Sequence, residues 1–209
     1  MYEILQGHGV VPVIKFNAEK EILPLADALA AGDIKIMEIT YRSDLATQAI
    51  ETVVKERPDI LVGAGTVLDL EQLKAAAAAG AKFIVSPGFD SKLVEAGLKL
   101  GLIMLPGCVT PSEIMAARQL GLRVLKFFPA SNYGGLATIK ALASVFGDVS
   151  YMPTGGVTAE NLADYLAVPE IFACGGTWMV KNQLLAEGAF DKVTRLSREA
   201  MEIYHRIRP

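Results

Sequence analysis

A lysine interrupts one of the most apolar segments of the sequence, Val124-Leu125-Lys126-Phe127-Phe128-Pro129. Lysine is almost never fully buried in a protein unless it has a partner. Desolvation favours the neutral amine over the charged one, and a neutral lysine amine is the nucleophile that forms Schiff bases with carbonyl compounds. The position of Lys126 therefore indicates either a nucleophilic amine or one half of a buried ion pair.

A glutamate and an arginine occur close together in another apolar segment, Ile36-Met37-Glu38-Ile39-Thr40-Tyr41-Arg42. Alternate residues of a strand share a face, so Glu38, Thr40 and Arg42 are expected on one side. Burying a carboxylate is costly unless it is paired, and Glu38 is therefore either a general acid/base or the ion-pair partner of Lys126. A carboxylate near the amine favours its charged form, whereas the Arg42 guanidinium favours the neutral form. The sequence leaves open which effect dominates.

Glycine pairs follow two further apolar segments, in Pro153-Thr154-Gly155-Gly156 and Cys174-Gly175-Gly176-Thr177. Backbone N–H groups without neighbouring side chains can point at an anion, and a helix N-terminus favours negative charge there. The threonines add hydroxyl donors. We therefore expect a phosphate group to bind at Thr154, Gly155, Gly156, Gly176 and Thr177.

Eight short apolar runs, rich in Val, Ile and Phe, must position these residues, and they start 20 to 27 residues apart. Runs that are apolar at nearly every position suit strands that are covered on both faces, as in parallel sheets. The predicted strands are Val10–Phe16, Ile34–Thr40, Leu61–Thr66, Phe83–Gly88, Ile103–Val109, Val124–Ala130, Ser150–Gly156 and Ile171–Thr177.

Segments with helical spacing separate the runs. Ala18–Ala31 has apolar residues at helical spacing, and Asp69–Ala79 is rich in Ala and Leu, which are strong helix formers. Thr110-Pro111-Ser112-Glu113 offers an N-cap residue, a proline at the first helical position and a glutamate at the third. Thr158–Asn161 is predicted to start another helix. Glycines stand where helices should stop, at Gly32, Gly80, Gly101 and Gly121.

Strand–helix alternation repeated eight times is typical of a (β/α)₈ TIM barrel, an α/β fold in which chemistry takes place at the C-terminal ends of the strands. We predict a near-minimal barrel that forms a single domain over residues 1–209, with residues 1–9 as an N-terminal helical extension. The alternative is a doubly wound open sheet, which would need a glycine-rich phosphate turn after the first strand. Residues 15–20 contain no glycine.

The composition excludes several classes of protein. Of the 209 residues, 52% are hydrophobic and 21% charged, which excludes a disordered chain. The net charge of −3, without clustered basic residues, argues against a nucleic-acid partner. No uninterrupted apolar run approaches ~18 residues, and a signal peptide is not recognised, so we expect no membrane partner and a cytoplasmic location. The two cysteines and two histidines have no metal-site spacing, and no metal is predicted.

Six motifs occur together in a fixed order: Glu38-Ile39-Thr40-Tyr41-Arg42, Gly63-Ala64-Gly65-Thr66-Val67, Ser86-Pro87-Gly88, Lys126-Phe127-Phe128-Pro129-Ala130, Pro153-Thr154-Gly155-Gly156-Val157 and Gly175-Gly176-Thr177-Trp178. In these motifs, and over essentially its whole length, the sequence closely resembles the 2-keto-3-deoxy-6-phosphogluconate (KDPG) aldolases. That family is also described as bifunctional, with 4-hydroxy-2-oxoglutarate (KHG) aldolase as the second activity.

The resemblance implies a role for each residue that matches a motif. Lys126 corresponds to the Schiff-base lysine of the family and Glu38 to its general acid/base. The other matches form three sets: Arg42 and Thr66 for the pyruvate carboxylate, Pro87 and Phe128 for the apolar walls around the pyruvate methyl group, and Gly155, Gly156, Gly176 and Thr177 for the phosphate end. The family usually has serine at the position of Thr177, so the added methyl group bears on phosphate affinity or substrate preference.

The resemblance further implies a class I aldolase that cleaves KDPG to pyruvate and D-glyceraldehyde 3-phosphate, with KHG as a second substrate that yields pyruvate and glyoxylate. It implies no cofactor, no metal and a homotrimer, and Arg42 favours the gluconate epimer over the galactonate epimer. Two rival functions stay open. A phosphosugar isomerase or epimerase of the same fold would share the glycine pairs without needing a nucleophilic amine, and a non-catalytic phosphosugar-binding protein would bind ligand without turnover. A metal-dependent aldolase would need ligands that the strand ends do not offer.

Overall fold

The structure, a computed structural model, describes residues 2–208, so the first and last residues of the domain predicted over 1–209 lie outside it. Each strand lies inside one of the eight apolar runs predicted to be strands. The strands are β1 (Val10–Ile14), β2 (Ile36–Thr40), β3 (Leu61–Gly65), β4 (Phe83–Ser86), β5 (Ile103–Pro106), β6 (Val124–Phe127), β7 (Ser150–Pro153) and β8 (Cys174–Gly176). Two strands begin later than predicted, β2 at Ile36 and β8 at Cys174. Before β8, Ile171 forms no more than an isolated bridge to Tyr151.

The strands form a curled parallel sheet of six, in the order β5-β4-β3-β2-β1-β8, and a separate parallel pair, β6-β7. Isolated parallel bridges connect the pair to the sheet on both sides, Gly107 with Lys126 and Thr154 with Gly175. The predicted α/β class with parallel strands is therefore confirmed, and the ladder is continuous over six of the strands.

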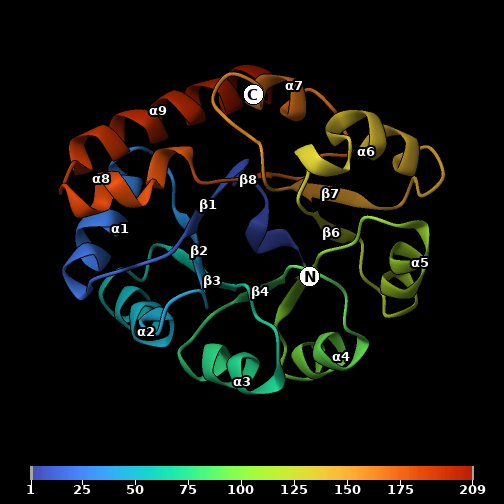
Figure 1. The fold of residues 1–209 in the computed structure, drawn as a ribbon, viewed down its shortest axis with the longest axis horizontal. Coiled ribbons are helices and arrows are strands. Elements are labelled where there is room, and N and C mark those ends of the chain that lie inside the picture. Colours follow the sequence, from blue (N-terminus) through green and yellow to red (C-terminus); the bar gives the residue numbers. More distant parts are fainter. Residues whose placement is uncertain (1, 209) are drawn as a thin grey trace.

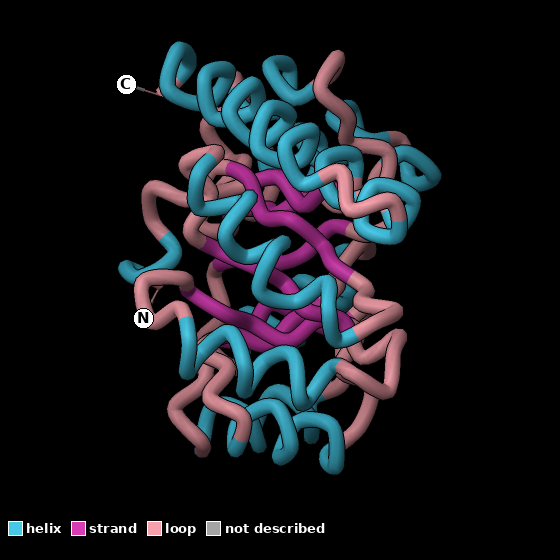
Figure 2. Tube along the Cα trace, turned by 90° about the vertical axis from the view of Figure 1, so that its left-hand side faces the viewer, coloured by secondary structure: helices cyan, strands magenta, loops and turns pink. Residues whose placement is uncertain are grey.

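Helices cover the outside of the strands (Figure 1), and a side view shows the strands enclosed between helical layers (Figure 2). The α-helices are α1 (Ile22–Ala31), α2 (Ala46–Glu56), α3 (Leu70–Ala78), α4 (Ser91–Lys99), α5 (Pro111–Gln119), α6 (Gly135–Ala143), α7 (Leu162–Leu166), α8 (Asn182–Ala186) and α9 (Phe190–Ile207). Short 3₁₀ segments are η1 (Glu3–Leu5), η2 (Glu19–Glu21), η3 (Ser131–Tyr133) and η4 (Trp178–Val180). Among residues 2–208, no helix combines the length and apolar character that a membrane span requires.

Local sequence signals explain where some of the helices begin: the side chain before α3, α4 and α5 accepts a hydrogen bond from the first turn. In α5, the Thr110 hydroxyl accepts a hydrogen bond from the Glu113 N–H, and the Glu113 carboxylate accepts from the Thr110 N–H, as the predicted capping box requires. The helix predicted to start at Thr158 is wrong by four residues, since α7 begins at Leu162. There the Asn161 side chain accepts from the Thr158 N–H and holds the preceding residues in a turn.

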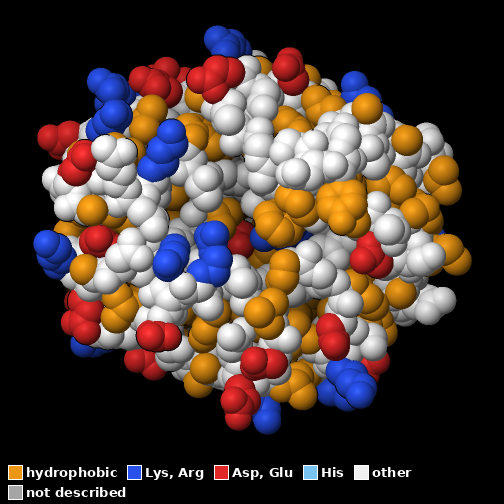
Figure 3. Space-filling model, in the orientation of Figure 1, with side chains coloured by type: hydrophobic (Ala, Val, Ile, Leu, Met, Phe, Trp, Pro, Cys, Tyr) orange, Lys and Arg blue, Asp and Glu red, His pale blue; other side chains and the backbone are white. Residues whose placement is uncertain are grey.

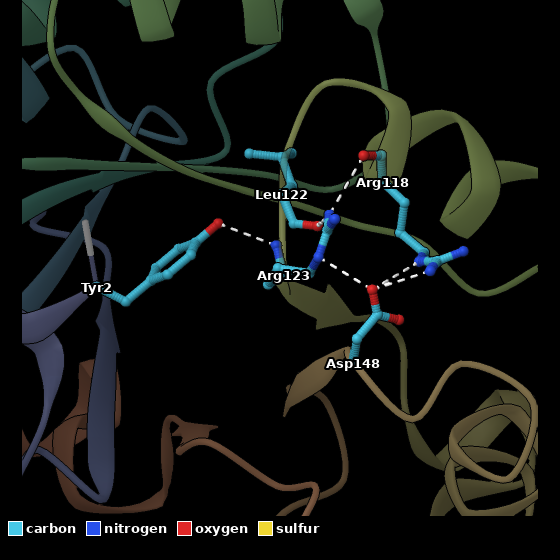
Figure 4. Close-up of polar contacts among 5 residues, drawn as sticks. All are labelled: Tyr2, Arg118, Leu122, Arg123 and Asp148. Atoms are coloured by element: carbon cyan, nitrogen blue, oxygen red, sulfur yellow. Dashed lines mark hydrogen bonds and ion pairs between the residues drawn. The ribbon is translucent and has the colours of Figure 1, made fainter.

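A polar cluster joins the N-terminal segment to the beginning of β6 (Figure 4). The Arg123 N–H donates to the Tyr2 hydroxyl at 3.3 Å, next to the first residue of β6. Asp148 accepts from Arg118 at 2.9 Å and lies 3.0 Å from Arg123 Nε. The hydrogen bond from Arg118 lowers the pKa of the Asp148 carboxyl below its usual value of 3.8. The cluster thus connects the N-terminal segment, α5 and the turn before β7 at the beginning of β6, the strand that contains Lys126.

Candidate active site

The buried amine and the buried carboxylate meet at the centre of the molecule. Lys126 projects from β6 and Glu38 from β2, and Lys126 Nζ lies 3.4 Å from Glu38 Oε1. The two side chains are 5% and 0% exposed. Lys126 Nζ also lies 5.1 Å from the centre of the Phe128 ring, within the range of a cation–π contact. The ion pair that the sequence left as one alternative is therefore present, and it brings the two predicted catalytic groups into contact.

The neighbouring strand β3 makes room for the Glu38 carboxylate. A Cβ at Gly65 would lie 2.2 Å from Glu38 Oε1, so only glycine fits beside this side chain. Glu38 Oε2 is buried and finds no hydrogen-bond partner among residues 2–208. Buried carboxylate oxygens are normally paired, so this oxygen is an unused hydrogen-bond acceptor in the interior.

A cavity of about 200 Å³, the central cavity, opens above this ion pair. Figure 3 shows a hollow near the middle of the same face, bordered by charged and hydrophobic side chains. Every predicted site residue except Glu38 lines the cavity: Arg42, Thr66, Pro87, Lys126, Phe128, Thr154, Gly155, Gly156, Gly176 and Thr177. Glu38 is reached through its contact with Lys126.

Two lining residues, Val13 and Val157, were not predicted. Val13 lies on β1 directly opposite Glu38 in the sheet register, and it supplies an apolar wall beside the ion pair. Valines are frequent in this sequence, and only the register between strands distinguishes this one. Val157 is the last residue of the motif that begins at Pro153, so its place in that motif was an available signal.

The two glycine-containing strand ends lie at one side of the cavity. Gly155 and Gly156 have φ angles of +89° and +85°, a backbone conformation that favours glycine. A Cβ at Gly175 would lie 2.2 Å from Thr154 Oγ1, so glycine is needed where β7 and β8 approach each other. Thr154 Oγ1 is buried without a hydrogen-bond partner among the described residues. Thr177, by contrast, is exposed at the cavity mouth.

The opposite side of the cavity combines a guanidinium, a strained hydroxyl residue and a proline. Arg42 follows β2, and its Nε donates to Thr40 Oγ1 at 3.1 Å. Thr66 follows β3 with φ of +54°, which is costly for a β-branched residue. Such strain concentrates at functional sites. Pro87 follows β4 and lines the cavity together with Arg42, Thr66 and Phe128.

The thiol of Cys108 is a poor nucleophile in this setting. Cys108 is fully buried, and burial raises the pKa of its thiol to about 12. Within residues 2–208, no group of three or more histidine, cysteine, aspartate or glutamate side chains is arranged to hold a metal ion.

Comparison with known proteins agrees with this geometry. The family described as "KDPG and KHG aldolase" matches residues 1–196. A 2-dehydro-3-deoxy-phosphogluconate aldolase of Pseudomonas aeruginosa is 47% identical over 193 residues, which are 92% of this chain and 88% of the relative. The one of Treponema pallidum is 44% identical over 203 residues, 97% of each chain. A KDPG aldolase of Legionella pneumophila, crystallised with pyruvate as a covalent carbinolamine intermediate, superimposes with a TM-score of 0.91 at 36% identity, covering 94% of this chain and 96% of the other. The chain belongs to the KDPG and KHG aldolase family.

Proposed function

We propose that the chain is a class I aldolase, a lyase that cleaves KDPG to pyruvate and D-glyceraldehyde 3-phosphate and also cleaves KHG to pyruvate and glyoxylate. One observation carries the proposal: a buried lysine amine lies 3.4 Å from a buried carboxylate at the wall of a small cavity. The family supports it. So does the Legionella aldolase, in which pyruvate was captured as a covalent carbinolamine.

Lys126 begins the reaction as the neutral amine, after its proton has passed to the Glu38 carboxylate or to solvent. The amine adds to the C2 carbonyl carbon of the substrate and forms a carbinolamine. The carbinolamine hydroxyl then takes up that proton, from Glu38 or from solvent, and leaves as water, which restores the Glu38 carboxylate. The product is an iminium ion, a cation that accepts the electron pair of a neighbouring bond. The apolar wall of Phe128 and Val13 limits the water around this cation.

Glu38 then serves as the general base of carbon–carbon cleavage. It removes the proton from the C4 hydroxyl, the C3–C4 electron pair moves to the iminium, and the aldehyde product leaves. The remaining enamine is protonated at C3, and hydrolysis of the resulting iminium releases pyruvate and restores the Lys126 amine. The unpartnered Oε2 of Glu38 supports this role, because it can accept the hydroxyl proton.

The residues around Lys126 contact different parts of the substrate. Arg42 offers paired N–H donors for the carboxylate, and Thr66 adds a hydroxyl at the neighbouring strand end. Pro87 and Phe128 form apolar walls for the carbon that becomes the pyruvate methyl group. The phosphate lies at the glycine-rich side, at Thr154, Gly155, Gly156, Gly176 and Thr177.

The finer architecture is also a proposal. The six-stranded sheet and the β6-β7 pair are joined by bridges on both sides, which supports a closed (β/α)₈ barrel. We infer a single domain over residues 1–209, with residues 1–9 as an N-terminal extension that contains η1. The family resemblance supports a cytoplasmic homotrimer, and sedimentation velocity of the purified protein measures its oligomeric state.

A substrate panel tests the proposed function. The purified protein is incubated with KDPG, its galactonate epimer and KHG, and pyruvate release is measured with lactate dehydrogenase. We expect pyruvate from KDPG at the highest kcat/KM and unchanged rates in EDTA. A phosphosugar isomerase or a non-catalytic binding protein releases no pyruvate from any of them, and that result would refute the proposal.

A further inference from the structure

We propose that Thr40 is a positioning residue: its hydroxyl fixes the Arg42 guanidinium so that both terminal nitrogens face the carboxylate of the keto acid. The proposal rests on the proposed function, because it assumes that Arg42 binds that carboxylate. Thr40 itself does not line the central cavity. It is the last residue of β2 and only 1% exposed.

The direction of the Thr40 hydroxyl proton follows from its neighbours. Thr40 Oγ1 lies 2.7 Å from the carbonyl oxygen of Ile14 on the adjacent strand β1. A carbonyl oxygen only accepts hydrogen bonds, so the hydroxyl donates its proton to Ile14. The oxygen of Thr40 is then left as an acceptor. It meets the Nε–H of Arg42 at 3.1 Å.

This arrangement selects which guanidinium nitrogens remain for a ligand. Nε is occupied by Thr40, and Arg42 makes no other hydrogen bond or ion pair within residues 2–208. The two terminal nitrogens are therefore available as a pair, the geometry that suits bidentate recognition of a carboxylate. Because Arg42 is an exposed, long side chain, anchoring one end reduces the conformational freedom that it loses when it binds a ligand.

The hydrogen-bond chain also connects the carboxylate site to the rigid sheet. β1 and β2 are paired in parallel, with Ile14 opposite Ile39 in the register. A chain of two hydrogen bonds thus runs from the Ile14 carbonyl through the Thr40 hydroxyl to the Arg42 guanidinium. If Thr40 only stabilised the fold, its hydrogen bond to the Ile14 carbonyl would suffice, and the hydrogen bond that its oxygen accepts from Arg42 Nε would have no purpose.

A double-mutant cycle distinguishes positioning from a structural role. The variants are Thr40→Val, Arg42→Gln and the double variant, with Thr40→Ser as the conservative rescue. Thr194→Val is the matched control, because Thr194 on α9 also donates to a backbone carbonyl, that of Ala28, far along the chain from Arg42. Each variant is measured for kcat and KM with KDPG, and for the pyruvate concentration that half-saturates borohydride trapping.

The expected result is a split between binding and turnover. Thr40→Val raises KM and the half-saturating pyruvate concentration by ~3- to 10-fold, with kcat within about twofold of wild type. Thr40→Ser stays close to wild type, and Thr194→Val leaves both constants unchanged. In the Arg42→Gln background, Thr40→Val causes no further increase.

Two results would overturn the proposal: an unchanged half-saturating pyruvate concentration in Thr40→Val, or an effect of Thr40→Val that persists in full on Arg42→Gln. If Thr40→Val does not fold, Thr40→Ala takes its place in the same cycle. If wild-type protein traps pyruvate but the effects are additive, only the role of Thr40 fails. If wild-type protein traps no pyruvate, the proposed function fails and the positioning role with it.

Discussion

Glu38→Gln removes one negative charge from the interior while it keeps nearly the same side-chain volume. The carboxylate is fully buried, and its Oε1 lies 3.4 Å from Lys126 Nζ. At that distance the gross attraction is about 5 kcal/mol for an effective dielectric constant of about 20, and desolvation of both groups offsets much of it. Removing one partner of such a pair costs about 3 kcal/mol of folding free energy. For a chain of this size the Tm falls by roughly 6–12 °C, so the variant remains folded at room temperature.

The loss of turnover is expected to be far larger than the loss of stability suggests. Glutamine cannot accept the C4 hydroxyl proton, and a positioned general base contributes at least ~100-fold to the rate. Turnover of KDPG is measured by pyruvate release at room temperature, after circular dichroism has confirmed folding. Glu21→Gln is the matched control: Glu21 is a buried glutamate, 3% exposed, that accepts from the N–H of Asn17 and has no contact with the central cavity.

We expect Glu21→Gln to lose stability and keep its turnover, and Glu38→Gln to lose both. If Glu38→Gln retains turnover within about tenfold of wild type, Glu38 is not the group that removes the C4 hydroxyl proton.

Three further substitutions test other parts of the account. Thr66→Gly relieves the positive φ of +54°, and we expect it to raise the unfolding free energy by about 1 kcal/mol. The KM for KDPG is expected to rise. If urea unfolding shows that the variant is less stable than wild type, the backbone at Thr66 is not strained. Thr177→Ser removes a methyl group at the cavity mouth, and we expect a ~2- to 5-fold lower KM for KDPG and no change for KHG; equal effects on both substrates would remove Thr177 from the phosphate end. Asp148→Asn tests the depressed carboxyl pKa: because the hydrogen bond from Arg118 lowers that pKa below 3.8, wild type is the more stable protein above pH 3.8, and its advantage in urea unfolding disappears as the pH falls through the folded-state value. If the stability difference between wild type and Asp148→Asn stays constant as the pH falls through that value, the hydrogen bond between Arg118 and Asp148 does not stabilise the fold.

The strands were predictable because parallel strands covered on both faces are apolar at nearly every position. All eight runs contain a strand. Hydrogen-bond continuity was not predictable from apolar patterning. β5 ends at Pro106 and β7 at Pro153, and proline has no N–H to extend a ladder. The joins beside β6 and β8 are accordingly isolated bridges, at Gly107 and Thr154.

The polar members of the candidate site could be identified because their burial is costly. Lys126 and Glu38 stand in apolar runs, where an unpaired charge is costly, so their contact was one of the two alternatives that the sequence offered. Val13 could not be identified, because a valine in a strand is the expected residue and its place opposite Glu38 depends on register. The Thr40–Arg42 hydrogen bond was equally hidden, since the sequence placed the two on one face without indicating which atoms meet.

The most direct test of Schiff-base formation by Lys126 is to identify the residue that pyruvate modifies. Protein is incubated with pyruvate and sodium borohydride, digested, and analysed by peptide mass spectrometry, with Lys126→Arg as the control. We expect one reduced pyruvate adduct, on Lys126, that is absent from the variant. An adduct on another lysine, or an unmodified Lys126 at saturating pyruvate, would contradict it.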